Sequence, residues 1–586
     1  MILKNPLLIL LLILFPFISY CQMHDPLITP FELHKTNYSA TYQECKDWYQ
    51  KADATFETIK VLDYGLTDGG HPLQLAIYSA DKDFSRESLH QKSKRIILIM
   101  NAIHPGEPEG VDASMLLLRD MATQKEWAAI LKNIVVLIIP QYNIEGVINR
   151  SSYSRANQDG PESYGFRGNG ENLDLNRDFI KCDSKNTRAF EQIFREWNPD
   201  VFIDNHTSDG ADYQYTLTYI SIMSGSLPPV LGDYINNNLT PAIGKRCAAD
   251  GFDMIPYVET FKETPDSGIT GFAATPRYSM GYAGLWNTIA YTVETHMLKP
   301  FDERLKANYA FMKACINEVY LNDNKISALR NEANSIRQNA KTCDLQLRMD
   351  TAKYDLIDFK GYEAGYKKSL LTGADRLYYD RTKPYIKKVP YYNYFKPLLQ
   401  IQKPEYYIIP QACWKAVELL KLNKIIMTPL DEDTIMSVDM YYIDGYENAP
   451  GKTPSNGHYQ HHNVKLHSEK QQVTFHKGDY LIITNQEGIE YIIQTLEPQA
   501  DDSYFSWNFF DGFLQQREYF SDYVFEDMAF KFIEDHPEIK TEFENKKKTD
   551  LTFANNPKSQ IDWVYRHSPY FEKTYMRYPV GRVMGE

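Results

Sequence analysis

The sequence has few cysteines, no excess of positive charge and almost no long apolar runs, and each of these absences excludes a class of protein. Seven cysteines occur in 586 residues, none in a Cys-X-X-Cys pair, so a zinc-finger framework is excluded. Lys and Arg total 63 against 77 Asp and Glu, a formal net charge of −14. A chain without a basic field does not hold a phosphate backbone, so nucleic acid is not an expected partner. What is present, 43% hydrophobic and 24% charged residues, is the composition of an ordinary globular protein.

The one long apolar run lies at the N-terminus. Pro6 to Tyr20 is almost continuously apolar and follows the single cation Lys4. Small residues occupy the minus-three and minus-one positions of a cleavage site after Cys21. This layout predicts a secretory signal peptide over residues 1–21. About 15 apolar residues fall short of the roughly 20 that a membrane-spanning helix needs. A lipoprotein signal with Cys21 acylated is the alternative, but Tyr20 occupies a position where a small residue is expected. We therefore expect a secreted or periplasmic protein with no transmembrane segment in the mature chain.

The cysteines that remain after such a cleavage dictate no disulfide pattern. They are Cys45, Cys182, Cys247, Cys315, Cys343 and Cys413. Six cysteines allow fifteen pairings, and their long spacings favour none of them. Disulfide pairing stays open.

Short β-branched runs alternate with amphipathic stretches from Phe56 to Thr295, which is typical of an α/β fold. The predicted buried strands are Arg95–Met100, Ile134–Ile139, Val201–Ile203 and Thr288–Val293, and the predicted helices include Glu109–Met121 and Asn186–Trp197. We expect a mixed, mostly parallel sheet flanked by helices. Long polar, glycine-rich segments at 151–172 and 256–284 interrupt the alternation, and such loops usually carry function.

The pattern changes near residue 300. Residues 301–345 predict one or two charged helices, and the chain beyond them is rich in Tyr, Lys and Pro with short strand signals. The predicted division is a signal peptide (1–21), a first α/β domain (22–300), a helical connector (301–345) and a C-terminal mixed α/β accessory region (346–586). Aromatic-rich helices are expected after Asp501.

Chemistry-bearing residues follow the predicted strands. His104-Pro105-Gly106-Glu107 comes directly after the first of them, and His206 follows the strand at 201–203. Because ligands bind at the carboxyl ends of parallel strands, two imidazoles and a carboxylate are expected to converge there. Two nitrogens and one oxygen with an open fourth position suit catalytic Zn²⁺. For each of these residues taken alone, the alternative to a metal ligand is a structural role, in which a buried histidine is hydrogen-bonded to an acidic side chain.

Two further motifs complete the pattern. Asn176 and Arg177 are adjacent at a predicted turn into a helix, and together an amide and a guanidinium can bind a carboxylate through two hydrogen bonds. Glu294 ends the apolar strand at 288–293, where a carboxylate facing a water is a candidate general base.

The order of His-Pro-Gly-Glu, Asp-Leu-Asn-Arg-Asp-Phe, Asp-Asn-His and Thr-Val-Glu-Thr resembles the zinc carboxypeptidases, peptidase family M14. The resemblance covers about residues 40–300 and includes Pro140 to Gly146. The C-terminal tail resembles that of secreted M14 proteins of Bacteroidota-type bacteria, on Glu497-Pro498 and the stretch 502–511. The resemblance implies one Zn²⁺ per chain and hydrolysis of C-terminal peptide bonds.

Carried over residue by residue, the resemblance assigns roles as follows: metal ligands His104, Glu107 and His206; general base Glu294; carbonyl-polarising Arg167, with Arg155 in reserve; and substrate carboxylate binding by Asn176 and Arg177. The family's substrate-capping tyrosine has no unambiguous counterpart, because Phe272 occupies its usual place while Tyr278 and Tyr282 lie nearer Glu294. Both tyrosines are candidates for substrate binding.

Two other functions fit the same motifs. A zinc amidase or deacylase acting on peptidoglycan stem peptides or N-acyl amino acids would share the ligands and the base and differ in the pocket. An inactive binding homologue is the second alternative, although the presence of Glu294 argues against it. The expected partner is a peptide or protein with a free C-terminal carboxylate, and the preferred terminal side chain stays open.

Overall fold

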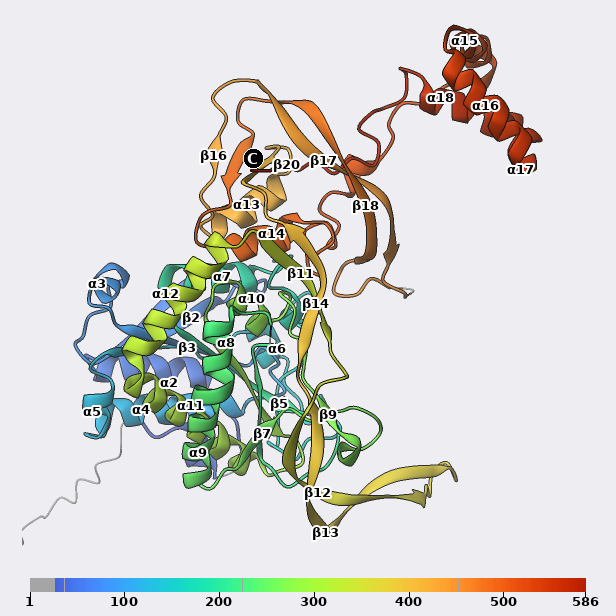
Figure 1. Ribbon diagram of the computed structural model, residues 1–586. Helices are drawn as coiled ribbons and strands as arrows, with labels where there is room; N and C mark the ends of the chain where they lie inside the picture. The colour runs from blue at the N-terminus through green and yellow to red at the C-terminus, as the bar shows by residue number, and fades with distance from the viewer. Residues whose placement is uncertain (1–26, 36, 224, 452, 586) are drawn as a thin grey trace, which may run out of the picture.

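A computed structural model describes residues 27–585 except 36, 224 and 452, and its first part is built on an eight-stranded sheet (Figure 1). The predicted signal peptide lies outside the described residues. In order across the sheet the strands are β1 (Ile59–Leu66), β2 (Pro72–Ser79), β4 (Ile134–Ile139), β3 (Arg95–Asn101), β5 (Val201–Ser208), β10 (Ile289–His296), β6 (Leu217–Ser221) and β7 (Met254–Pro256). The four central strands, β4, β3, β5 and β10, are parallel to one another, whereas β1, β2 and β6 run antiparallel to their inner neighbours. The predicted mixed, mostly parallel sheet is confirmed.

The central strands form where the chain is richest in β-branched aliphatic residues. Every residue of β4 is buried, and β3 is buried from Ile96 onward. Continuous apolar runs of this kind are stable only when helices cover both faces of the sheet.

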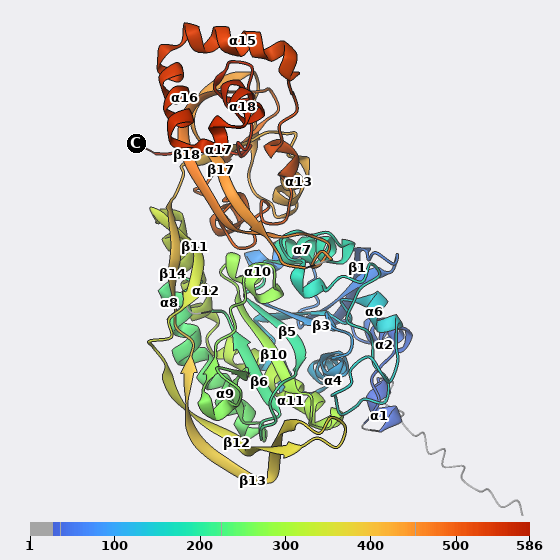
Figure 2. The same ribbon diagram turned by 90° about the vertical axis from the view of Figure 1, so that its right-hand side faces the viewer.

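Helices cover the sheet on both sides. Figure 2 shows α7 and α10 on one side of the strands and α4 and α11 on the other, where α11 also contacts α9. The helices of this part are α1 (Pro30–His34), α2 (Tyr42–Thr55), α3 (Arg86–Gln91), α4 (Glu109–Thr123), α5 (Trp127–Ile130), α6 (Ile144–Ile148), α7 (Lys185–Trp197), α8 (Pro229–Tyr234), α9 (Thr240–Ala249), α10 (Ser279–Leu285), α11 (Phe301–Leu321) and α12 (Asp323–Asn339). Ser184 caps α7 by accepting a hydrogen bond from the backbone N–H of Thr187, and Asn198 ends the helix in the left-handed conformation.

Two central strands extend further than the sequence predicts. β5 continues from Ile203 to Ser208 and β10 from Val293 to His296, so His206 and Glu294 lie within strands. The polar residues stay in the sheet because their backbone N–H and C=O groups are hydrogen-bonded to the neighbouring strands. Glu294 pairs in register with His206. The sheet itself therefore places these two side chains next to each other.

The C-terminal region, which we define as residues 341–585, contains three further sets of strands. β11 (Thr342–Met349) pairs with β14 (Phe395–Gln402), and the long hairpin of β12 (Asp355–Lys368) and β13 (Asp375–Tyr392) projects from the body (Figure 1). The hairpin is joined to β9 (Ile269–Thr270) and β8 (Glu259–Thr260) of the first part. The third sheet comprises β16 (Thr428–Pro429), β19 (Tyr480–Ile483), β15 (Tyr406–Ile409), β20 (Gly581–Val583), β17 (Thr434–Asn448) and β18 (His461–Phe475).

Helices complete the C-terminal region. They are α13 (Trp414–Leu422), α14 (Ile489–Leu496), α15 (Asp522–Asp535), α16 (Pro537–Thr549), α17 (Leu551–Ala554) and α18 (Pro557–His567). The last four form a group at the end of the molecule opposite the β12–β13 hairpin (Figure 1). The helices expected after Asp501 begin only at Asp522, because the aromatic stretch from Tyr504 to Phe510 forms packed turns.

The predicted connector forms two helices, α11 and α12, followed by β11 from Thr342. α11 packs against α4, α9 and β10, so it contributes to the covering of the first sheet. The domain boundaries at 300 and 345 stay predictions.

The six cysteines after position 21 are all buried and free. Within the described residues, no helix combines the length and apolar character needed to cross a membrane.

Candidate metal and substrate site

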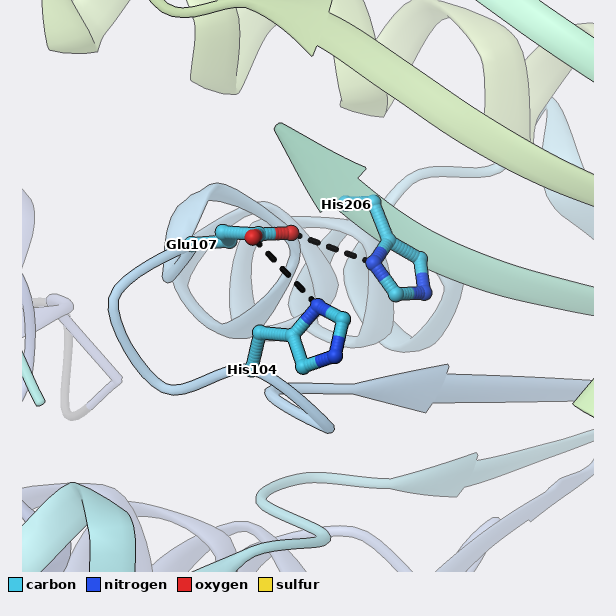
Figure 3. A group of neighbouring side chains, drawn as sticks. All are labelled: His104, Glu107 and His206. Atoms are coloured by element: carbon cyan, nitrogen blue, oxygen red, sulfur yellow. Dashed lines mark hydrogen bonds and ion pairs between the residues drawn. The ribbon is translucent and has the colours of Figure 1, made fainter. Parts of the chain in front are cut away.

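His104, Glu107 and His206 converge at the carboxyl ends of the central strands. Figure 3 shows the carboxylate of Glu107 between the two imidazoles. Nδ1 of His104 lies 3.3 Å from Glu107 Oε1, and Nδ1 of His206 lies 3.1 Å from Glu107 Oε2. One potential ligand atom from each residue lies within 4.8 Å of the others, and all three side chains are buried. The predicted convergence therefore occurs, and the set is a possible metal site.

A tight turn after β3 produces this arrangement. Ala102 adopts a left-handed conformation at the strand end, and the backbone N–H of Glu107 donates to the carbonyl of His104 at 2.9 Å. Gly106 lies so close to Arg155 that a Cβ on it would approach Arg155 Cδ to 2.6 Å. The turn thus brings His104 and Glu107 onto one face, as their spacing predicts, and glycine makes room for the arginine.

A second carboxylate stands behind each imidazole. Nε2 of His104 lies 3.0 Å from Asp174 Oδ1 in a hydrogen bond, whereas Nε2 of His206 lies 2.9 Å from Asp204 Oδ2 without hydrogen-bond geometry. An imidazole that donates Nε2–H to a carboxylate presents Nδ1 to a metal and becomes a stronger ligand. Burial alone would raise the pKa of Asp174, but the neighbouring His104, Arg167 and Arg177 outweigh it and hold that pKa well below its usual range. Asp174 therefore stays ionised and able to orient His104.

Glu294 opens onto the same cavity. The cavity has a volume of about 240 Å³. Its lining comprises His104, Glu107, Arg155, Arg167, Asn176, Arg177, His206, Thr207, Ser208, Asp209, Ile220, Tyr257, Phe272, Ala274, Tyr278, Ser279, Met280, Thr292 and Glu294. Burial raises the pKa of Glu294 to about 8, against the opposing effect of His206. A carboxylate whose pKa is raised by burial is suited to accept and return a proton near neutral pH.

The predicted arginine and its reserve both reach the site. Arg155 donates from Nη1 to Glu107 Oε1 at 2.6 Å. Arg167 donates from Nε to Asp174 Oδ2 at 3.0 Å, and its Nη1 lies 3.8 Å from Glu107 Oε1. Asn143, within the segment 140–146, supports Arg167 by donating from Nδ2 to its carbonyl at 2.9 Å. Two guanidinium groups therefore flank the Glu107 carboxylate.

Asn176 and Arg177 also line the cavity, in a short 3₁₀ turn (Leu175–Arg177), and Nη1 of Arg177 lies 3.9 Å from Asp174 Oδ2. Asn176 Oδ1 accepts a hydrogen bond from the backbone N–H of Ser279 at 3.0 Å. The guanidinium carbon of Arg177 lies 4.4 Å from the centroid of the Tyr278 ring. An amide and a guanidinium so placed can bind a carboxylate with directed hydrogen bonds.

The two candidate tyrosines have different locations. Tyr278 lines the cavity, whereas Tyr282, a residue of α10, is fully buried. The Tyr282 hydroxyl donates to Asn423 Oδ1 at 2.6 Å, and its ring packs against Phe194. The structure therefore brings Tyr278 to the predicted site residues and leaves Tyr282 in the core. Tyr278 is the extended N-cap residue of α10, whereas Tyr282 lies within the helix and packs against α7 and Tyr491.

Sequence reasoning did not identify Asp174 and Asp204 as partners of the histidines. Asp204 precedes His206 by two residues in one strand, so both side chains point to the same face, a signal that was available. Asp174 begins the Asp-Leu-Asn-Arg motif, but no local spacing links it to His104, which lies 70 residues away.

Comparisons with known proteins agree with this geometry. Residues 45–225 match the family model described as zinc carboxypeptidase, Peptidase_M14. This match confirms the resemblance and the predicted enzyme class, a zinc metallopeptidase of the M14 type.

Individual relatives are carboxypeptidases by name. Carboxypeptidase 2 of Trichophyton rubrum is 21% identical over 455 residues, which cover 74% of this chain and 77% of that protein. Probable carboxypeptidase 2 of Trichophyton verrucosum is 29% identical over 131 residues, or 22% of each chain. A solved metallo-carboxypeptidase from Burkholderia cenocepacia has 17% identity and a TM-score of 0.37, with 49% of this chain and 70% of that chain covered. The resemblance of the C-terminal tail stays a prediction.

Proposed function

We propose that this chain is an exported zinc carboxypeptidase that removes the C-terminal residue of a peptide. The observation that carries the proposal is the meeting, on one cavity, of a His–Glu–His ligand set, a partly buried glutamate and an Asn–Arg pair. Each group has a separate task in hydrolysing a bond next to a terminal carboxylate.

The residues fit a zinc ion. Nδ1 of His104 and of His206 and the carboxylate of Glu107 form a donor set typical of catalytic zinc. Asp174 orients the His104 imidazole through a hydrogen bond, and the carboxylate of Asp204 lies 2.9 Å from His206 Nε2. When bound, zinc would polarise a carbonyl and lower the pKa of a water.

The remaining steps belong to the chain's own side chains. Glu294 takes a proton from the attacking water and delivers it to the amine that leaves. Arg167, with Arg155 beside it, faces the negative charge that develops on the carbonyl oxygen. Asn176 and Arg177 hold the terminal carboxylate, which limits cleavage to the last peptide bond.

Arg177→Ala tests the proposal with two peptides that are identical except for a free carboxylate or an amide at the C-terminus. The parent protein, loaded with zinc, should release the terminal amino acid from the free peptide. Loss of the charged hydrogen bonds should destabilise the transition state for that peptide by about 1.5–3 kcal/mol, which lowers kcat/KM by about 10- to 150-fold. Arg188→Ala, which removes a half-exposed guanidinium on α7, is the matched control and should be neutral.

A parent enzyme that cuts both peptides equally, and that Arg177→Ala does not change, would contradict the proposal. A parent that releases nothing from peptides but deacylates N-acyl amino acids or muropeptides would be a zinc amidase or deacylase instead.

A further inference from the structure

One segment of the cavity wall, residues 269–279, lies between the first part of the molecule and the C-terminal region. It begins with β9, ends at the start of α10, and supplies Phe272, Ala274 and Tyr278 to the cavity lining. The segment belongs to the first part in sequence, yet the C-terminal region holds it at both ends.

The beginning of the segment is held by the β12–β13 hairpin. Ile269 and Thr270 pair in parallel with Tyr391 and Tyr392 at the end of β13. The backbone N–H of Gly271 then donates to the carbonyl of Tyr392 at 2.8 Å. This end is an added strand of a sheet that the C-terminal region provides.

The end of the segment is held by one carboxylate. Asp502 accepts hydrogen bonds from the backbone N–H of Arg277 at 2.9 Å and from its Nε at 2.6 Å. Asp502 is 1% exposed, so these bonds are shielded from water. Gln460 Oε1 accepts from Nη1 of Arg277 at 3.0 Å, and the ring centroid of Trp507 lies 5.1 Å from the guanidinium carbon. Three side chains of the C-terminal region thus enclose one arginine.

The residues around Arg277 are the ones that contact the proposed carboxylate-binding pair. The carbonyl of Arg277 accepts from the backbone N–H of Phe179 at 3.3 Å. The ring of the next residue, Tyr278, stacks on Arg177, and the backbone N–H of Ser279 binds Asn176. A shift of Arg277 would therefore move contacts to both members of the pair.

We propose that the C-terminal region is a structural part of the substrate site, and that Asp502 is a positioning residue that holds Arg177 and Asn176 in place through Arg277. The inference rests on the proposed function, because it assumes that Asn176 and Arg177 bind the substrate carboxylate. Asp502 lies 225 residues from Arg277 in the chain and does not line the cavity.

Asp502→Asn in the full-length, zinc-loaded protein tests the inference. The substitution preserves shape but replaces one accepting oxygen with an NH₂ group that faces a donor of Arg277. We expect KM for a peptide with a free carboxylate to rise on the order of tenfold, with kcat changed less than about twofold, because binding is misplaced while the zinc ligands and Glu294 are untouched.

The matched control is Glu497→Gln. Glu497 is likewise buried and pairs with an arginine, Arg582 at 3.0 Å, but both residues belong to the C-terminal region and neither lines the cavity. It should lower the melting temperature as Asp502→Asn does and leave KM at the parent value. A KM that rises equally in both variants would reduce Asp502 to a general stabilising role and overturn the inference.

A double-variant cycle tests the route through Arg277. Because Arg277→Gln removes the guanidinium contact with Asp502 but keeps the backbone one, adding Asp502→Asn to it should raise KM by a smaller factor than it does in the parent. Additive effects would overturn the inference. If Asp502→Asn does not fold, Arg277→Lys keeps the buried charges balanced and changes only the geometry, and it should raise KM in the same direction.

Failure of the inference and failure of the proposed function give different results. A parent that ignores the substrate carboxylate and does not respond to Arg177→Ala refutes both. A parent that requires the carboxylate, together with an Asp502→Asn variant of parental KM and kcat, refutes the inference alone.

Discussion

The two sides of the cavity are built in different ways. The side that carries His206 and Glu294 is formed by neighbouring strands of one sheet, whose register alone sets the two side chains in place. The side that carries Tyr278 is formed by a segment without regular ladder partners in that sheet, and its position depends on residues more than a hundred positions further along the chain. The first side is positioned by the core of the sheet, whereas the second is positioned by separate contacts from the C-terminal region. Under the proposed function, the sheet carries the general base and one metal ligand, and the segment contacts the pair that binds the substrate carboxylate.

The largest expected effect tests the sheet side. Glu294→Gln should lower kcat by about a thousandfold, because a positioned general base contributes roughly 10²–10⁴-fold and a carboxamide cannot accept the proton. Zinc content should remain at one ion per chain, since Glu294 is not one of the three proposed ligands. Metal analysis and initial rates on a free-carboxylate peptide measure both quantities. A variant within about tenfold of the parental kcat would remove Glu294 from the proposed role.

A smaller effect is expected from Asp174, which does not belong to the proposed ligand set but binds one of its members, His104. Asp174→Asn should weaken zinc binding by about 10- to 100-fold, because the imidazole of His104 loses the carboxylate that orients it. Competition with a chelator measures the zinc dissociation constant. Asp209→Asn serves as the control, since Asp209 lines the same cavity and its carboxylate accepts from the Tyr257 hydroxyl at 3.3 Å. Equal zinc affinity in the parent and in Asp174→Asn would show that the sheet side does not need this support.

The smallest effects separate the segment side from the core. Tyr278→Ala should raise KM by about 2- to 5-fold, since Arg177 loses an aromatic contact worth about 0.5–1 kcal/mol.

Tyr282→Phe is the companion variant on the same helix. It should leave KM unchanged and lower the free energy of unfolding by about 1–2 kcal/mol, because Asn423 loses a buried hydrogen bond. Peptide kinetics and denaturant titration distinguish the two outcomes. A changed KM in Tyr282→Phe would bring that residue back into the site.

The same contrast explains what the sequence could predict. Apolar runs that are typical of central strands precede the four residues His104, Glu107, His206 and Glu294. Their meeting at one edge of the sheet was therefore predictable, because ligands bind at the carboxyl ends of parallel strands. Tyr278 and Tyr282 could not be separated in this way, because their locations depend on where α10 begins and on its packing against α7 and the C-terminal region.

The role of the C-terminal region was beyond sequence reasoning for a related reason. Nothing local to Asp502 indicates that its carboxylate binds the main chain of Arg277, since the contact is made only when two distant segments fold together. The aromatic stretch around Trp507, expected to be helical, instead packs as turns that enclose this contact.

The six buried thiols have a practical consequence. Burial raises the pKa of each thiol, from Cys45 near the start of the chain to Cys413 in the C-terminal region, so none reacts readily while the native packing holds. Alkylation of a given cysteine therefore requires a local opening event, and its rate reports the free energy of that event. The cysteines can therefore serve as built-in probes of local unfolding. Comparing the alkylation rates of Cys182 and Cys413 would show whether the two parts of the molecule open together or one at a time.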